Sequence, residues 1–117
     1  MVTFESVRRL ALALPDVEEA TSYGTPALKR RGKLFIRLRE DGDSLVVRML
    51  QEQRAEMIAA EPAVYHLTDH YLDYPWILVR LSKVHPDAMR DLVKMAWALV
   101  APTKRPAAKR QSKRRSK

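Results

Sequence analysis

Residues 27–49 read ALKRRGKLFIRLREDGDSLVVRM and carry three strand patterns in succession. Apolar and polar residues alternate over 27–31, 33–39 and 44–49, which is typical of strands that bury one face. Gly32 separates the first two runs, and the pair Asp41-Gly42 between the second and third is a strong hairpin signal. This stretch therefore predicts a meander of three antiparallel strands.

The flanking sequence adds helices and further strands. Apolar residues at helical spacing predict a first helix capped by Thr3 and ended by Pro15, and a last helix that begins at Pro86 behind a weaker cap, His85. A modest helix is predicted over 51–60, and strands over 18–23, 64–67 and 76–82. Because each helix has one apolar stripe to bury, we expect an α+β fold in which the helices pack on one face of an antiparallel sheet and the other face meets solvent.

Positive charge is concentrated at the end of the chain. The 117 residues carry a formal net charge of +8, with 22 basic and 14 acidic residues, and eight of the basic residues lie after residue 101, where there is no acid. The body, residues 1–101, is therefore formally neutral and long enough for one hydrophobic core. Residues 102–117 lack apolar periodicity, and we expect them to form a disordered basic tail.

The tail predicts affinity for a polyanion. Flexible cations bind the phosphate backbone without reading sequence, because they release condensed counterions. The tail cations are Lys104, Arg105, Lys109, Arg110, Lys113, Arg114, Arg115 and Lys117.

The composition also indicates a compartment. The chain has no cysteine, which fits a reducing environment, and it shows neither a secretory signal pattern nor an apolar run of membrane-spanning length. We expect a cytoplasmic protein, with association to the nucleoid as one form of that location. We expect no membrane partner, since the tail has no large apolar side chain to enter a lipid interface.

The exposed face of the predicted sheet displays basic and aromatic side chains. If Leu34, Ile36 and Leu38 point into the core, their neighbours point outward, and such a face can hold phosphates and stack bases. The same pattern also arises when basic side chains merely cover a sheet, and it would equally suit a protein or a small acidic ligand. The candidate binding residues of the body are Lys29, Arg31, Lys33, Phe35, Arg37, Arg48, Trp76 and Arg80.

No catalytic, metal or cofactor motif stands out. His66, Asp69 and His70 have a spacing that would converge on a metal only in a helix, whereas the surrounding aromatic residues favour strand and loop. No nucleophile motif surrounds any serine or histidine. We therefore predict no metal site, no cofactor and no enzymatic activity, and keep Tyr23 and His70 as a candidate pocket for a minor enzymatic hypothesis.

Several short motifs together resemble the MmcQ/YjbR family of small bacterial proteins. They are Leu14-Pro15-Asp16-Val17-Glu18-Glu19, Ser22-Tyr23-Gly24-Thr25-Pro26-Ala27, Arg31-Gly32-Lys33-Leu34-Phe35 and His70-Tyr71 ahead of Trp76-Ile77-Leu78-Val79-Arg80-Leu81. The resemblance implies a frataxin-like fold, described as a double wing, and a family commonly labelled DNA-binding. It does not extend to iron binding, because Arg8 and Arg9 stand on the first helix where an acidic ridge would be needed. The basic tail extends beyond the usual end of the family.

The leading hypothesis is a nucleic-acid-binding protein, DNA or RNA, in which the tail holds the backbone and the outward sheet face adds contacts. The alternative is a module that binds a protein or a small acidic ligand on the same face, with the tail dispensable. The sequence leaves the oligomeric state open.

Overall fold

A computed structural model describes residues 2–101. The predicted disorder of the basic tail lies outside these residues. All the predicted helices and strands are present within them, in the order α1 (Phe4–Leu12), β1 (Val17–Ser22), β2 (Thr25–Arg30), β3 (Lys33–Leu38), β4 (Ser44–Arg48), α2 (Gln51–Ala60), β5 (Tyr65–His66), the 3₁₀ turn η1 (Asp69–Tyr71), β6 (Trp76–Arg80) and α3 (Pro86–Leu99).

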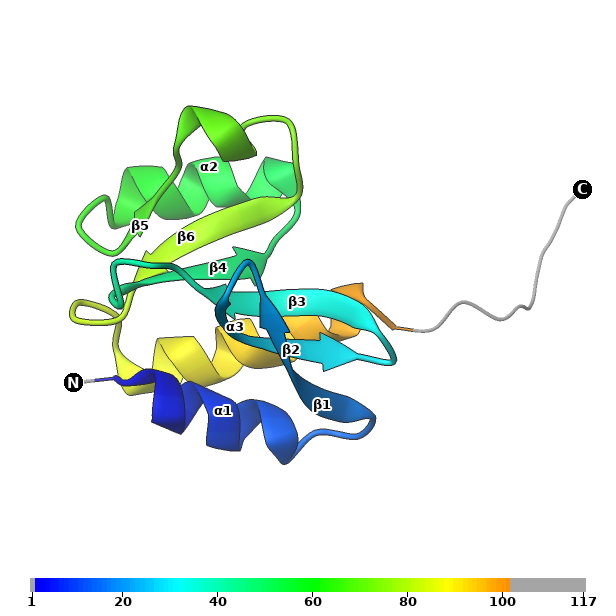
Figure 1. Cartoon of the computed structure of the whole chain (residues 1–117). Helices are drawn as coiled ribbons and strands as arrows, with labels where there is room; N and C mark the ends of the chain where they lie inside the picture. Colours follow the sequence, from blue (N-terminus) through cyan, green and yellow to red (C-terminus); the bar gives the residue numbers. More distant parts are fainter. Residues whose placement is uncertain (1, 102–117) are drawn as a thin grey trace, which may run out of the picture.

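The strands form one antiparallel sheet in the order β1-β2-β3-β4-β6-β5. Helices α1 and α3 lie side by side across one face of it, while α2 lies beyond β6, next to β5 (Figure 1). Apolar residues of α1, α3 and the inner sheet face form the core, with Val7, Met89, Leu45 and Val79 fully buried. The predicted α+β class is confirmed.

Helices α1 and α3 both begin with a side-chain cap. Thr3 caps α1 as predicted, accepting a hydrogen bond from the backbone N–H of Ser6. His85 also caps α3, because its Nδ1 accepts from the backbone N–H of Asp87 at 3.1 Å. The expected weaker cap is therefore still a side-chain cap.

Two tight turns of the same geometry join β1 to β2 and β2 to β3. Tyr23 and Gly24 have φ values of 53° and 79°, and Arg31 and Gly32 have 51° and 82°. Two successive positive φ values are what a type I′ hairpin turn requires, and glycine provides the second at no steric cost. The first position is less usual, because Tyr and Arg rarely adopt the left-handed conformation.

A β-bulge corrects the predicted alternation in β3. Ile36 pairs with Leu28 and Leu34 with Lys29, so Phe35 is an extra residue without a partner on β2. Phe35 is consequently fully buried in the core beside Ile36, and Leu34 turns to the outer face. The prediction that Phe35 points outward was wrong, because strict alternation does not hold across a bulge.

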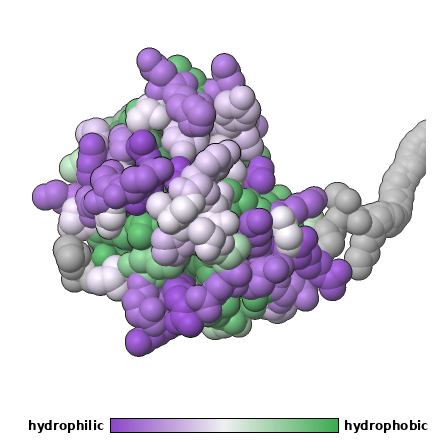
Figure 2. All heavy atoms as spheres, viewed as in Figure 1, coloured by the Kyte–Doolittle hydropathy of each residue, from purple (hydrophilic) through white to green (hydrophobic). Residues whose placement is uncertain are grey.

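The outer face of the sheet is also more covered than predicted. Val46 and Leu78 are paired neighbours on β4 and β6, and both are buried although neither belongs to the inner core. In Figure 2, pale and apolar atoms form a band across the middle of the molecule, with hydrophilic side chains above and below. The expectation of a solvated outer face is therefore wrong for the strands next to the 67–75 segment.

Candidate functional site

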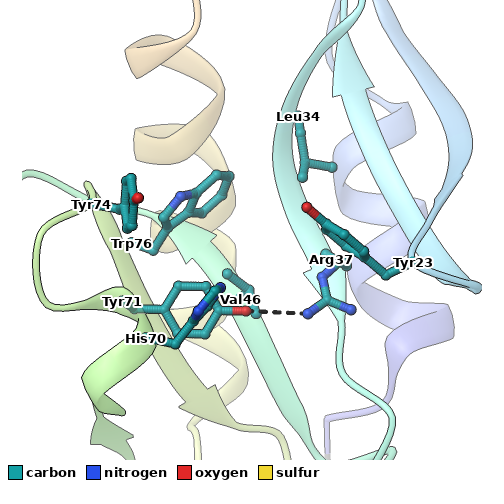
Figure 3. Close-up of a pocket in the computed structure, with 8 residues that line it drawn as sticks. All are labelled: Tyr23, Leu34, Arg37, Val46, His70, Tyr71, Tyr74 and Trp76. Atoms are coloured by element: carbon teal, nitrogen blue, oxygen red, sulfur yellow. Dashed lines mark hydrogen bonds between the residues drawn. The ribbon is translucent and has the colours of Figure 1, made fainter.

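An aromatic pocket opens on the outer face of the sheet. Its volume is about 350 Å³. Figure 3 shows two groups of side chains facing each other across it, with Val46 of β4 between them. One group comes from η1 and the chain leading into β6, and the other from β3 and the β1–β2 turn. The eight lining residues are Tyr23, Leu34, Arg37, Val46, His70, Tyr71, Tyr74 and Trp76.

The aromatic wall is held in place from behind by Arg54 of α2. Arg54 is 7% exposed, and its guanidinium donates to the carbonyls of Tyr71, Leu72, Tyr74 and Trp76. A guanidinium has five N–H donors in a rigid fork, so one side chain is able to hold several carbonyls of an irregular segment. Arg54 therefore positions the wall without lining the pocket.

Arg37 of β3 forms the polar part of the pocket. It is only 6% exposed, and it donates from Nη1 to Oγ1 of Thr25 at 3.1 Å and from Nη2 to the hydroxyl of Tyr71 at 3.2 Å. The carboxylate of Glu40 lies 3.8 Å from Nη1. The prediction that Arg37 lies on the outer face is confirmed. Its side chain is nevertheless buried in that face instead of being exposed to solvent.

Tyr23 stands over this arginine at the tip of the β1–β2 turn. Its ring centroid is 5.2 Å from the guanidinium carbon of Arg37, within the range of a cation–π contact. The side chain is nevertheless 84% exposed. On the opposite side His70 is exposed and packs edge-on against the Tyr71 ring, with centroids 4.8 Å apart. The structure thus brings together the two residues predicted as a candidate pocket.

Arg48 and Trp76 form the other cation–π pair of the site. The guanidinium carbon of Arg48 lies 4.6 Å from the Trp76 ring centroid, and Nε donates to the carbonyl of Leu34 at 3.2 Å. Burial lowers the pKa of Arg48 from its ordinary value. Its charge therefore adds to the pocket edge in a partly desolvated position, where attraction to an anion is less screened.

The other predicted basic residues are dispersed. Lys33 is exposed and Lys29 half-buried near the β2–β3 turn, where Arg31 is paired with Asp16 at 3.4 Å. Arg80, half-buried at the far end of β6, donates to the carbonyl of Ala63 at 3.5 Å. The eight tail cations lie outside the described residues. Of the predicted body residues, the structure gathers Arg37, Arg48 and Trp76 at the pocket.

Sequence reasoning missed four lining residues and the arginine behind them. Leu34 was expected to point inward, because the bulge is not visible in the sequence. Val46 was not considered as a site residue, because it is apolar. Tyr71 and Tyr74 lie in a segment rich in aromatic residues, and this richness was the sequence signal for the aromatic side of the pocket. Arg54 gave no signal, because a charged residue in a helix usually faces solvent.

His66 lies outside the pocket and has a shifted pKa. Burial and the charges of Arg80 and Arg39 lower the pKa of His66. Within residues 2–101, no three His, Asp or Glu side chains come together in a way that would hold a metal ion. No helix in the same range is long and apolar enough to cross a membrane.

Comparison with known proteins supports the resemblance seen in the sequence. Uncharacterized protein Rv2570 of Mycobacterium tuberculosis and uncharacterized protein Mb2600 of Mycobacterium bovis are each 39% identical to the chain, over 87% of it and 91% of the relative. A crystal structure of Deinococcus radiodurans protein DR2400, with the family domain DUF419, shares the fold with a TM-score of 0.74 at 20% identity, covering 86% of this chain and 79% of that one. The YjbR family model matches residues 12–99. The chain therefore belongs to the YjbR family.

Proposed function

We propose that the protein binds nucleic acid and that the aromatic pocket receives an unpaired base. The observation that carries this proposal is the pocket itself, in which Trp76, Tyr74 and Tyr23 surround a concave space next to the guanidinium groups of Arg37 and Arg48. Aromatic rings beside cations are how proteins bind single strands without reading sequence, because every base has a face on which to stack.

The pocket favours an unpaired base over a duplex. Its rings line a hollow of about 350 Å³ rather than a raised surface. A base inside a duplex is stacked and paired, and bringing it into such a hollow would first require its extrusion at a cost of a few kcal/mol. An unpaired base avoids that cost.

In this proposal the body and the tail contribute different contacts to the nucleic acid. The body is formally neutral, and at the pocket Arg37 is buried and Arg48 half-buried, so the pocket itself displays little positive charge to a long backbone. The eight cations after residue 101 supply that charge. Affinity then comes mainly from the tail, and preference for unpaired bases from the pocket.

Fluorescence anisotropy with labelled single-stranded and duplex DNA of equal length, at several salt concentrations, tests both parts. We expect the full chain to prefer the single strand. A chain ending at Ala101 should bind more weakly, with a logarithmic salt dependence shallower by up to roughly six units, the value for eight cations on a single strand. Trp76→Ala should weaken single-strand binding about tenfold or more without changing the salt slope.

Leu72→Ala is the matched control for the pocket variant. Leu72 lies on the same segment as Trp76 and is half exposed, but it does not line the pocket. Its loss should leave affinity unchanged. If Trp76→Ala and Leu72→Ala behave alike, the pocket takes no base and only the tail remains as a nucleic-acid contact.

A small planar anion not attached to a polymer is the second candidate. The pocket volume of about 350 Å³ lies in the range of small-molecule sites, and Arg37 is buried in a way that suits one anionic group better than an extended strand. The two candidates differ in their dependence on length. A free ligand predicts equal affinity for a mononucleotide and an oligonucleotide in the chain ending at Ala101, whereas strand binding predicts tighter binding of the oligonucleotide.

A further inference from the structure

A second cavity adjoins the aromatic pocket and shares Arg37 with it. Its volume is about 220 Å³, and Tyr23, Arg37, His70 and Tyr71 line both spaces. The residues found only in this second cavity are Arg39, Glu40 and Thr68. One space is therefore mainly aromatic and the other mainly polar, and the shared residues make them neighbouring compartments of one site.

We propose that this second cavity is an anion subsite, which holds the phosphate group of a nucleotide whose base occupies the aromatic pocket. The inference rests on the proposed function and names the part of the ligand that the folded body reads besides the base. The charged residues that line this cavity are Arg37, Arg39 and Glu40.

Arg37 retains capacity for an anion. Among residues 2–101, its Nη2 bonds only the Tyr71 hydroxyl, which leaves the second N–H of that nitrogen available. Thr25 and Tyr71 fix the plane of the guanidinium from two sides. A fixed guanidinium binds phosphate with little loss of side-chain entropy, and the partly desolvated setting strengthens the interaction.

Arg39 supplies a second cation at the same cavity. It follows Arg37 by two residues and is half-buried. Its backbone N–H donates to the carbonyl of Ser44 at 2.9 Å, which fixes the chain there, and within the described part of the chain its side chain takes part in no ion pair. Two arginines and one glutamate thus line the cavity, and the lining carries a net positive charge.

Glu40 is the carboxylate in the lining of the second cavity. Its carboxylate oxygen lies 3.8 Å from Nη1 of Arg37, beyond hydrogen-bond distance, and the side chain is 66% exposed. An ion pair so open to water contributes little to stability and is easily exchanged. Glu40 therefore acts as an internal substitute that a phosphate, with more charge and more acceptor oxygens, displaces.

The test is isothermal titration calorimetry of the full chain with adenosine and with adenosine 5′-monophosphate. The two probes share a base and differ in the phosphate, and the tail is the same in every variant. We expect the wild type to bind the monophosphate about tenfold more tightly than adenosine, the value for one charge-assisted contact. Arg39→Gln should bring the two affinities close together.

Glu40→Gln gives the sharper result, because it removes a competitor instead of a contact. We expect it to bind the monophosphate up to about fivefold more tightly and adenosine with unchanged affinity. Glu56→Gln, an exposed carboxylate on α2 outside both cavities, is the matched control and should change neither affinity.

The outcomes separate the two proposals. Equal wild-type affinity for adenosine and the monophosphate would overturn the anion subsite and leave base binding in place. Tighter monophosphate binding that is insensitive to both Arg39→Gln and Glu40→Gln would assign the phosphate to the tail and also overturn the subsite. Binding of neither probe would overturn the proposed function itself. A single-stranded oligonucleotide that binds more tightly than the monophosphate, with the same dependence on Glu40, would identify the phosphate as part of a strand.

Discussion

The hydroxyl of Tyr71 accepts a hydrogen bond from Nη2 of Arg37 at 3.2 Å (Figure 3). This bond ties the segment that covers the outer sheet face to the middle of the sheet, across 34 positions of sequence. Both residues also line both cavities. The aromatic wall and the buried guanidinium are therefore one structural unit.

Tyr71→Phe should loosen that unit. The change removes one hydrogen bond to a buried charged group, and we expect a loss of roughly 1.5–3 kcal/mol in the free energy of unfolding. Urea denaturation measures it. Tyr74→Phe is the control, because the Tyr74 side chain is 55% exposed and its hydroxyl has no hydrogen-bond partner within residues 2–101. Equal stability of the two variants would show that the Tyr71 bond contributes nothing.

Arg54→Met should free the aromatic wall. Four carbonyls lose their charged donor, while those of Tyr71, Leu72 and Tyr74 each keep one other hydrogen bond. A hydrogen bond to a charged group contributes about 1.5–3 kcal/mol. We therefore expect a loss of at least about 2 kcal/mol in urea denaturation. Hydrogen exchange should also accelerate at the backbone amides of residues 71–76, of which Pro75 has none.

Arg90→Met is the matched control for that experiment. Arg90 is an exposed arginine on α3 whose ion pairs, to Asp87 and Asp91, are on the surface. Its replacement should change stability by less than about 1 kcal/mol. If amide exchange in residues 71–76 stays unchanged in Arg54→Met, the wall is held by its own packing.

The sequence predicted the elements of this fold because local signals are strong in it. Thr3, Pro15, Gly32 and the Asp41-Gly42 pair each mark a boundary through their own backbone chemistry, and the structure has boundaries at all of them. Which face of the sheet each strand side chain occupies was harder to predict. The unpaired Phe35 reverses the predicted direction of its own side chain and of Leu34 before it, and no local pattern marks such a bulge.

The site was predicted only in part, for a related reason. Arg37, Arg48 and Trp76 were identified from residue type, since aromatic and basic side chains on an open sheet face favour ligands. Tyr23 and His70 were identified only as a candidate pocket for the minor enzymatic hypothesis. The pocket that unites them depends on how residues 67–75 fold back over β4, and this path is fixed by Arg54 from a distant helix. A contact between elements far apart in sequence leaves no periodic signal.

Acidification below about pH 6.5 should destabilise the protein through His66. Burial, with help from Arg80 and Arg39 and against Asp41 and Asp43, lowers the pKa of His66 in the folded state. The unfolded chain, in which histidine titrates near about 6.5, therefore binds the proton more readily. The contribution is fully present above that pH and is lost as the pH falls toward the folded pKa.

Urea denaturation at pH 7 and pH 5.5 measures the effect. We expect the free energy of unfolding of the wild type to fall over this interval, and that of His66→Leu to fall less. A parallel decline in both proteins would assign the pH dependence to other groups.

Tyr23→Asn should separate stability from binding. Tyr23 holds a φ of 53° at the first central position of its turn, where Asn-Gly is the preferred pair, so the replacement should leave the fold equally stable or add up to about 1 kcal/mol. The same change removes the ring that stands over Arg37, and we expect single-strand affinity to fall about tenfold. Arg31→Asn, the equivalent change in the β2–β3 turn, should give a comparable stability without that loss. A Tyr23→Asn protein that binds as tightly as the wild type would show that the strained tyrosine serves the turn alone, whereas the expected result would mean that the chain keeps an unfavourable turn residue because its ring contacts the ligand.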